Sequence, residues 1–400
     1  MRNDESMDNY QKKTLSNLSL FAFVFFSLTS LQYAFINTDF EFTGVISTVF
    51  IGFEVAACFT CLTMAKCEIH TFIKIIAIFI VCFLNYVKTH ETVFVIELLA
   101  AVMFIMIDTK KLFKLIFYER LILLLFIMLC SCAGILPFKV VNVFKGGSTP
   151  TTVVGYALGY DHPNQLASAV CFLILSYICY KNERIKASNI FSIVVATLFV
   201  YLFSKSRTLL VITAFTLLMI VLLKFKITSG ALKGMLNVIS PWLLPVFATA
   251  SMVLPLSMAK ATGKFREYLW AINGLIGSRF THSARVFSTY KVPLWGGINQ
   301  FNELQNLYNY SVVDSGYINL LYDFGIIGFI IFIGLYIIAI RKLLNKQEYV
   351  YVIVTMAIFL WGITENILRS FGMNFTVVFW GLFFMHDIKQ KNRREVRGSL

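Results

Sequence analysis

The feature that most constrains this sequence is a series of long apolar runs that recurs along the whole chain. As helices, such runs are long enough to cross about 30 Å of hydrocarbon. Hydrophobic residues make up 58% of the 400 residues and charged residues only 14%, whereas about a quarter of a soluble domain is charged. The chain therefore lacks the polar surface to cover a soluble globule, and we expect an all-α polytopic membrane protein.

We expect about twelve spans, arranged as a single membrane domain over residues 1–400. The predicted spans cover residues 17–36, 44–64, 72–86, 92–107, 121–138, 165–180, 189–203, 208–223, 236–256, 315–340, 350–361 and 374–385. Two connections are much longer than the others, residues 139–164 and residues 257–314.

The net charge of +14 could indicate nucleic-acid binding, but the distribution of the cations favours a different explanation. If the N-terminus is placed inside, the connections on that side and the C-terminal tail hold 23 of the 35 Lys and Arg. Lys and Arg accumulate in short cytoplasmic loops. The charge therefore predicts a topology with both termini in the cytoplasm and both long loops outside. It is also compatible with some attraction to anionic lipid, and we expect no nucleic-acid partner.

The cysteines give no sign of a disulfide or a metal site. None of the eight lies in a predicted external loop, and Cys58 and Cys61 lie inside an apolar run, where small packing residues are common. No acidic cluster with metal-ligand spacing occurs outside, so we expect neither a metal nor another cofactor.

The first external loop ends at a predicted helix start. Pro163 disfavours helical geometry at His162, so a span is expected to begin at Asn164, with Asp161 and His162 near its positive dipole end. His162 is thus a candidate for catalysis. The alternative is that Asp161 and Asn164 are turn and cap residues and that His162 is merely interfacial.

A very short turn follows the seventh predicted span and holds Lys205 and Arg207 at the outer membrane boundary. Both are candidates for binding an anionic substrate. The alternative is that they reach toward the headgroups of the outer leaflet.

The second external loop carries six cations and a helical pattern. Apolar residues recur at helical spacing over residues 263–276, which suits a helix lying on the membrane surface and carrying Arg266. Arg279, His282 and Arg285 follow at intervals of three, so on a helix they share one face. Such a cluster suits an anion such as pyrophosphate. The alternative is a solvated basic face attracted to lipid phosphate.

Two acidic residues belong to the tenth predicted span. Asp314 lies at its external mouth, and Asp323 lies nine residues deeper, about 13 Å at helical rise. Carboxylates in lipid are costly and usually have a partner. Asp323 could serve only to hold helices together.

Four patterns in this order resemble the O-antigen ligase and Wzy-type polysaccharide polymerase superfamily. The quoted segments are His162-Pro163-Asn164, Ser206-Arg207, Arg285 followed by Gly296 in Pro293-Leu294-Trp295-Gly296-Gly297, and Gly316-Tyr317 through Gly325-Ile326-Ile327-Gly328. The resemblance covers residues 155–328, about the second half of the chain.

The resemblance implies a metal-independent glycosyltransferase in the bacterial plasma membrane, similar in fold to the multispanning GT-C-like glycosyltransferases. A hydroxyl of one undecaprenyl-pyrophosphate-linked oligosaccharide attacks the anomeric carbon of another at the outer face, and lipid pyrophosphate leaves. Such enzymes build capsular, exo- or O-antigen polysaccharide, working beside a flippase and a chain-length regulator.

The resemblance assigns Arg207 and Arg285 to pyrophosphate binding, and we add Lys205, Arg266 and Arg279 because they are close in sequence. Ligases of the superfamily tend to carry a His where this chain has Asp314, which favours a polymerase. Asp314 or His162 would be the general base.

Two alternatives stay open, a ligase that attaches finished glycan to another carrier and a flippase for lipid-linked sugars. Transporters usually place polar residues at mid-membrane and show internal repeats. Here the polar residues gather at one face, which favours surface chemistry.

Overall fold

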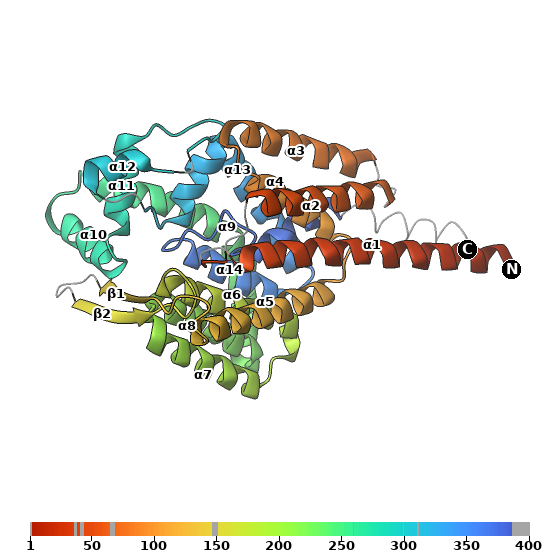
Figure 1. The fold of residues 1–400 in the computed structure, drawn as a ribbon, viewed down its shortest axis with the longest axis horizontal. Helices are drawn as coiled ribbons and strands as arrows, with labels where there is room; N and C mark the ends of the chain where they lie inside the picture. The colour runs from red at the N-terminus through yellow and green to blue at the C-terminus, as the bar shows by residue number, and fades with distance from the viewer. Residues whose placement is uncertain are drawn as a thin grey trace.

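The computed structural model describes residues 2–35, 38–40, 44–64, 69–145, 151–258, 260–298, 300–309 and 312–385. It is an elongated bundle of helices (Figure 1). Seven described helices are long and apolar enough to cross a membrane. They are α3 (Ile69–Thr89), α5 (Thr109–Cys132), α6 (Pro163–Lys181), α7 (Ala187–Ser204), α8 (Arg207–Lys224), α9 (Lys226–Met258) and α13 (Gly316–Asn345).

Five further apolar helical segments are shorter. They lie in α1 (Arg2–Ala34), α2 (Gly44–Met64), α4 (Val93–Phe104), α14 (Tyr349–Trp361) and the pair η2 (Phe375–Trp380) and α15 (Gly381–Phe384). Each predicted run falls on one of these twelve segments. The fold is therefore that of an α-helical polytopic membrane protein, as the sequence predicts.

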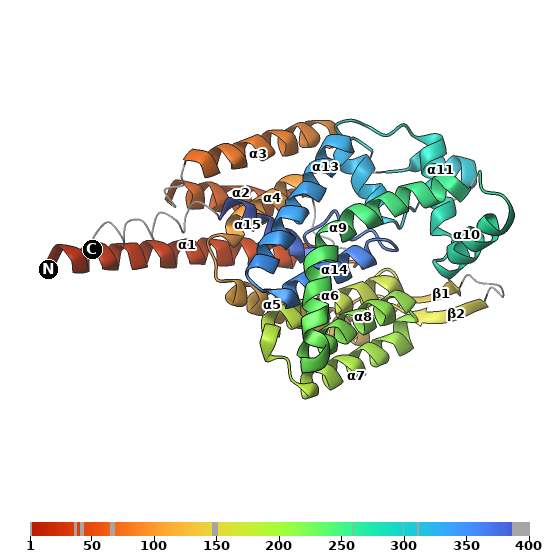
Figure 2. The ribbon, with the colours of Figure 1, turned by 180° about the vertical axis from the view of Figure 1, so that it is seen from behind.

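The two long connections lie at the same end of the bundle (Figures 1 and 2). One contains a hairpin of β1 (Val140–Lys145) and β2 (Thr151–Tyr156), paired antiparallel from Val140 opposite Tyr156 to Lys145 opposite Thr151. The other contains α10 (Gly263–Leu275), α11 (Arg279–Thr289) and α12 (Asn302–Tyr308). We call this the hairpin end, and the opposite end, where α1 begins, the far end.

The hairpin and the short helices refine the sequence prediction. The all-α prediction did not include β-strands, and the hairpin extends the first long connection away from the bundle (Figure 1). The predicted surface helix is present as α10, but its apolar side chains are divided. Leu269 is buried against the bundle, whereas Phe265 and Ile272 are exposed.

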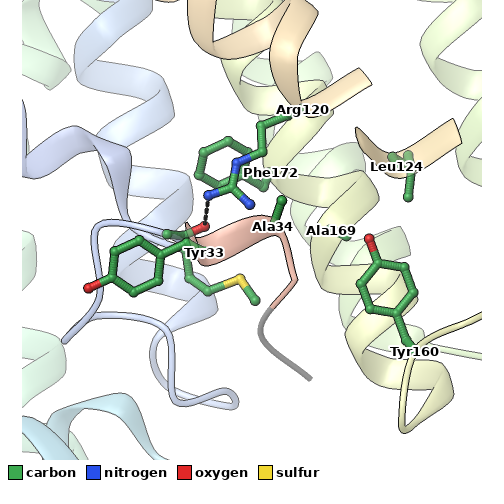
Figure 3. A pocket seen from close by; sticks show the side chains of 9 residues that line it. Tyr33, Ala34, Arg120, Leu124, Tyr160, Ala169 and Phe172 are labelled. Carbon is green, nitrogen blue, oxygen red and sulfur yellow. Dashed lines mark hydrogen bonds between the residues drawn. The ribbon is translucent and has the colours of Figure 1, made fainter. Parts of the chain in front are cut away.

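The predicted span 121–138 leaves Arg120 in the connection before it, but the structure places this residue inside a helix. α5 begins at Thr109, so Arg120 lies halfway along the helix. Its guanidinium lies 4.8 Å from the centre of the Phe172 ring and donates to the carbonyl of Gly372 at 3.3 Å (Figure 3). These contacts explain how a cation is accommodated inside the bundle. Because Arg120 was expected to lie outside the span, the predicted boundaries 121–138 lie toward the C-terminal side of α5.

The tenth predicted span is not continuous, because α13 breaks at Gly325. This residue has φ 72° and ψ 176°, a conformation that only glycine adopts readily. The loop that follows α11 fits into the break, and the carbonyls of Pro293 and Leu294 accept hydrogen bonds from Ile326 and Ile327. The loop thus replaces the helical hydrogen bonds that the break removes.

Asp323 lies beside this break and has a charged partner. Its carboxylate accepts a hydrogen bond from Arg369 at 3.0 Å, and its side chain is 1% exposed. The Asn85 amide donates to the carbonyls of Asp323 (2.7 Å) and Trp295 (3.2 Å). Asn85 therefore joins α3, the break in α13 and the inserted loop, and the contacts of Asp323 fit the packing alternative named above.

Six of the seven cysteines in the described chain are buried, as a packing role requires, whereas Cys132 is exposed. Cys58 and Cys61 are both buried, and the seven cysteines of the described chain are all free thiols. Cys67 and the basic residues of the C-terminal tail lie outside the described residues.

Candidate functional site

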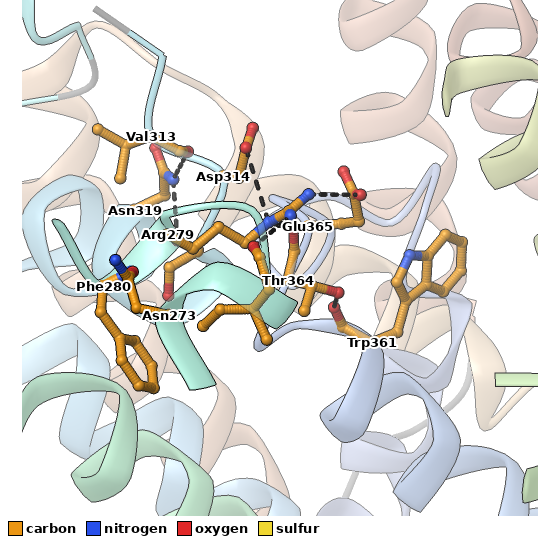
Figure 4. Close-up of polar contacts among 11 residues, drawn as sticks. Asn273, Arg279, Phe280, Val313, Asp314, Asn319, Trp361, Thr364 and Glu365 are labelled. Carbon is orange, nitrogen blue, oxygen red and sulfur yellow. Dashed lines mark hydrogen bonds and ion pairs between the residues drawn. The ribbon is translucent and has the colours of Figure 1, made fainter. Parts of the chain in front are cut away.

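Arg279 is the centre of a polar cluster at the hairpin end (Figure 4). Its guanidinium donates to the Glu365 carboxylate at 3.0 Å and lies 3.6 Å from the Asp314 carboxylate. It also donates to the backbone carbonyls of Thr364 and Ile276. Each of the three nitrogens of this guanidinium therefore has an oxygen partner within the protein, and the two carboxylates already offset its charge.

The position of Asp314 follows from a close backbone contact at the start of α13. The amide of Gly316 donates to the carbonyl of Gly362 at 2.9 Å. A Cβ atom on Gly316 would lie 2.9 Å from the carbonyl oxygen of Glu365. Glycine at position 316 thus lets α13 approach residues 362–365, and this brings Asp314 beside Arg279.

The two acids of the cluster bind protons more tightly than usual. Burial raises the pKa of Asp314, against the opposing effects of Arg279 and His162. Burial also raises the pKa of Glu365 to about 7, opposed by Arg279 and reinforced by the charge of Asp314. A carboxylate with a raised pKa is a better proton acceptor, so Asp314 has the property that a general base requires.

His162 lies close enough to Asp314 for its charge to affect the pKa of that carboxyl. It is the N-cap of α6, which begins at Pro163, and its Nδ1 accepts a hydrogen bond from the Asn164 amide at 3.1 Å. The helix start thus fixes the orientation of the ring. The structure places the two catalytic candidates, His162 and Asp314, in one region.

The turn between α7 and α8 reaches the same region. Ser206 and Thr208 line a small pocket together with Glu365. Lys205 adopts φ 56° and ends α7, and α8 begins at Arg207. A cation at the first residue of a helix opposes the helix dipole. Arg207 is exposed and makes no ion pair with any described carboxylate, so its guanidinium can accept an anionic ligand.

α11 carries Arg279, His282 and Arg285, as the spacing predicts, but their surroundings differ. The guanidinium of Arg285 lies 4.5 Å from the centre of the Tyr308 ring, and it has no carboxylate partner among the described residues. Burial lowers the pKa of His282 to about 4, and Arg285 and Arg279 add to this shift. His282 is therefore neutral at pH 7, and the charge of this face comes from the arginines.

Arg266 is exposed on α10, and no contact joins it to the cluster in the described part of the chain. The sequence prediction included no site residue from 362–374, although this segment supplies Thr364 and Glu365 to the site and Arg369 to Asp323. The sequence does indicate this segment, since Glu365 and Arg369 are charged residues in a short stretch between two apolar runs.

The site and the fold define a class of protein, a polytopic membrane protein with an arginine and carboxylate cluster at one end. Comparisons with protein-family models, with curated proteins and with solved structures find no match to the chain. Within the described residues, no group of three or more His, Cys, Asp or Glu side chains could hold a metal ion.

Proposed function

We propose that this protein is a polysaccharide polymerase of the Wzy type. It would join undecaprenyl-pyrophosphate-linked oligosaccharide repeat units at the outer face of the bacterial plasma membrane. In this proposal the chain crosses the membrane about twelve times in an arrangement similar to GT-C-like glycosyltransferases, with both termini in the cytoplasm. The hairpin end then faces outward.

The observation that carries this proposal is the convergence of the four patterns that suggested the family. The entry of α6 at His162 and the arginine-containing turn at Arg207 both border the cluster of Asp314 and Glu365. The loop at Gly296 packs against the break in α13 at Gly325, where a Cβ atom would lie 2.2 Å from the Gly296 nitrogen. The fourth pattern also begins beside the cluster, since Gly316 contacts residues 362–365, so segments far apart in sequence meet at one end of an apolar bundle.

The chemistry assigns separate roles to the residues of this region. Arg207 and Arg285, which have no carboxylate partners in the described chain, stabilise the negative charge of the departing pyrophosphate. The hydroxyl oxygen of the acceptor sugar bonds to the anomeric carbon, and Asp314 accepts the proton that this hydroxyl loses. The bond from that carbon to the pyrophosphate oxygen breaks, and undecaprenyl pyrophosphate leaves. Arg279 holds Asp314 and Glu365 in place.

The experiment compares surface polysaccharide from cells that carry the wild type, Arg207→Ala, Arg285→Ala or Arg184→Ala. Arg184 is an exposed arginine at the far end and serves as the charge-matched control. We expect the first two variants to lose polymer at least 100-fold, since oxyanion-stabilising donors are worth about this much. The control should make normal polymer, and membrane abundance should be unchanged in all.

Normal amounts of polymer in both Arg207→Ala and Arg285→Ala would refute the proposed roles. Loss of polymer in proportion to loss of protein would show instead that the two arginines are structural.

A further inference from the structure

A separate cavity of about 230 Å³ lies at the far end of the bundle, away from the cluster of Arg279. It is formed where α6 and α8 end, α9 begins and α13 turns into α14. Its lining includes Lys224, Lys233, Asn182, Gln347 and Tyr349. The proposed function makes no use of these residues.

Two ammonium groups give the cavity a positive character. Lys224 Nζ donates to the backbone carbonyls of Glu183 and Ile185, and an ammonium has a third proton to donate. Lys233 Nζ lies 5.3 Å from the centre of the Tyr349 ring. Neither lysine forms an ion pair with a described carboxylate, and the side chain of Glu183, which also lines the cavity, is exposed.

The same cavity contains an acceptor without a donor. Asn182 adopts φ 46°, and its amide nitrogen donates to Glu348 at 3.2 Å. Its side-chain oxygen is buried and has no hydrogen-bond partner. Because a buried unpaired polar atom is costly, a hydroxyl group that donates to this oxygen would be stabilised here.

The remaining wall is apolar. Ile220, Leu223 and Val350 line it, so the cavity places cations, a hydroxyl acceptor and hydrocarbon side by side. Basic cavities between membrane helices commonly bind anionic lipid headgroups. A phosphodiester with a nearby hydroxyl and an acyl chain would match all three features.

We propose that this cavity binds a phosphate ester with a neighbouring hydroxyl, presented by an anionic membrane lipid such as phosphatidylglycerol. The lysines pair with the phosphate, Asn182 accepts from the hydroxyl, and the apolar wall contacts the start of the acyl chains.

The test uses the delipidated full-length protein in detergent, titrated with phosphatidylglycerol or phosphatidylcholine and followed by native mass spectrometry. We expect phosphatidylglycerol to bind at least 10-fold more tightly than phosphatidylcholine. Lys233→Gln should weaken phosphatidylglycerol about 10-fold, as expected for one charge-assisted contact. Lys226→Gln is the matched control, since Lys226 is exposed near the cavity but does not line it, and it should bind as the wild type does.

Lys224 also donates hydrogen bonds to backbone carbonyls, so its removal could weaken the fold. Lys224→Arg keeps the positive charge at that position, and this variant should still prefer phosphatidylglycerol. Equal binding of the two lipids, or equal affinity in the wild type and Lys233→Gln, would overturn the proposal. If soluble glycerol phosphate bound as tightly as phosphatidylglycerol and with the same dependence on the lysines, the phosphate ester would not need to come from a lipid, and that part of the proposal would be overturned.

Discussion

Arg279 and Arg285 are six residues apart on α11, yet they have opposite surroundings. Arg279 contacts two carboxylates and two backbone carbonyls, whereas Arg285 contacts the ring of Tyr308. Removing Arg279 would leave two mostly buried acids without their cation. Removing Arg285 would leave no described acid unpaired, so the two substitutions should have different consequences.

We predict that Arg279→Ala destabilises the protein by roughly 3 kcal/mol, because breaking a largely buried ion pair on one side is costly. Arg285→Ala should lower the thermal midpoint by only a small amount. Thermal unfolding of both purified variants in detergent checks this difference. Equal midpoints would mean that the cluster around Arg279 contributes little to stability.

The pKa of Glu365 predicts a pH dependence of stability. Its folded-state value of about 7 lies above the ordinary 4.5, so the folded protein binds this proton more tightly than the unfolded chain. This contribution to stability is complete below about pH 4.5 and is lost as the pH rises through about 7. We expect the thermal midpoint of Glu365→Gln to fall less than that of the wild type over this range. Parallel pH profiles would contradict the raised pKa.

At the scale of elements, the break in α13 joins the helix to the loop that follows α11. Gly325 and Gly296 approach so closely that a Cβ on Gly296 would lie 2.0 Å from the carbonyl oxygen of Asp323. The break therefore fixes the end of the segment that carries Arg285. It also holds Asp323 where Arg369 can reach it.

We predict that Gly325→Ala sharply reduces the amount of folded protein, since alanine is strained at φ 72° and its Cβ meets the Gly296 backbone. Gly334→Ala in the same helix is the control. Apart from its own stretch of helix, no atom lies within 4 Å of a Cβ there, and alanine favours a helix by about 1 kcal/mol over glycine. The yield of each tagged variant, solubilised from membranes, is measured by size-exclusion chromatography. Similar yields of Gly325→Ala and Gly334→Ala would argue against the observed break.

The apolar elements could be predicted because membrane helices are marked by continuous hydrophobic runs, and each run falls on a helical segment. The break at Gly325 could not, because it depends on a loop that is distant in sequence and that supplies the missing acceptors. Arg120 was misplaced because a charged residue normally ends a span, whereas Phe172 and Gly372 accommodate it inside. Arg279 and Asp314 were recognised as candidates, but their pairing requires the contact between α13 and residues 362–365.

At the scale of the whole molecule, the proposal predicts which end faces outward. A cysteine introduced at Thr152, an exposed residue of the hairpin, should react with a membrane-impermeant maleimide in intact cells. A cysteine at Arg184 should react only after permeabilisation. The exposed Cys132 should first be replaced by serine to lower the background. The reverse pattern would invert the proposed topology and place the Arg279 cluster on the cytoplasmic side.

The central claim is that this protein joins lipid-linked repeat units. The most direct test separates lipid-linked glycans and surface polysaccharide from cells that lack it. We predict single repeat units accumulating on lipid at the outer face, with no ladder of longer products. Full-length polymer retained on lipid would identify a ligase instead, and repeat units trapped at the cytoplasmic face would identify a flippase and contradict the catalytic assignment.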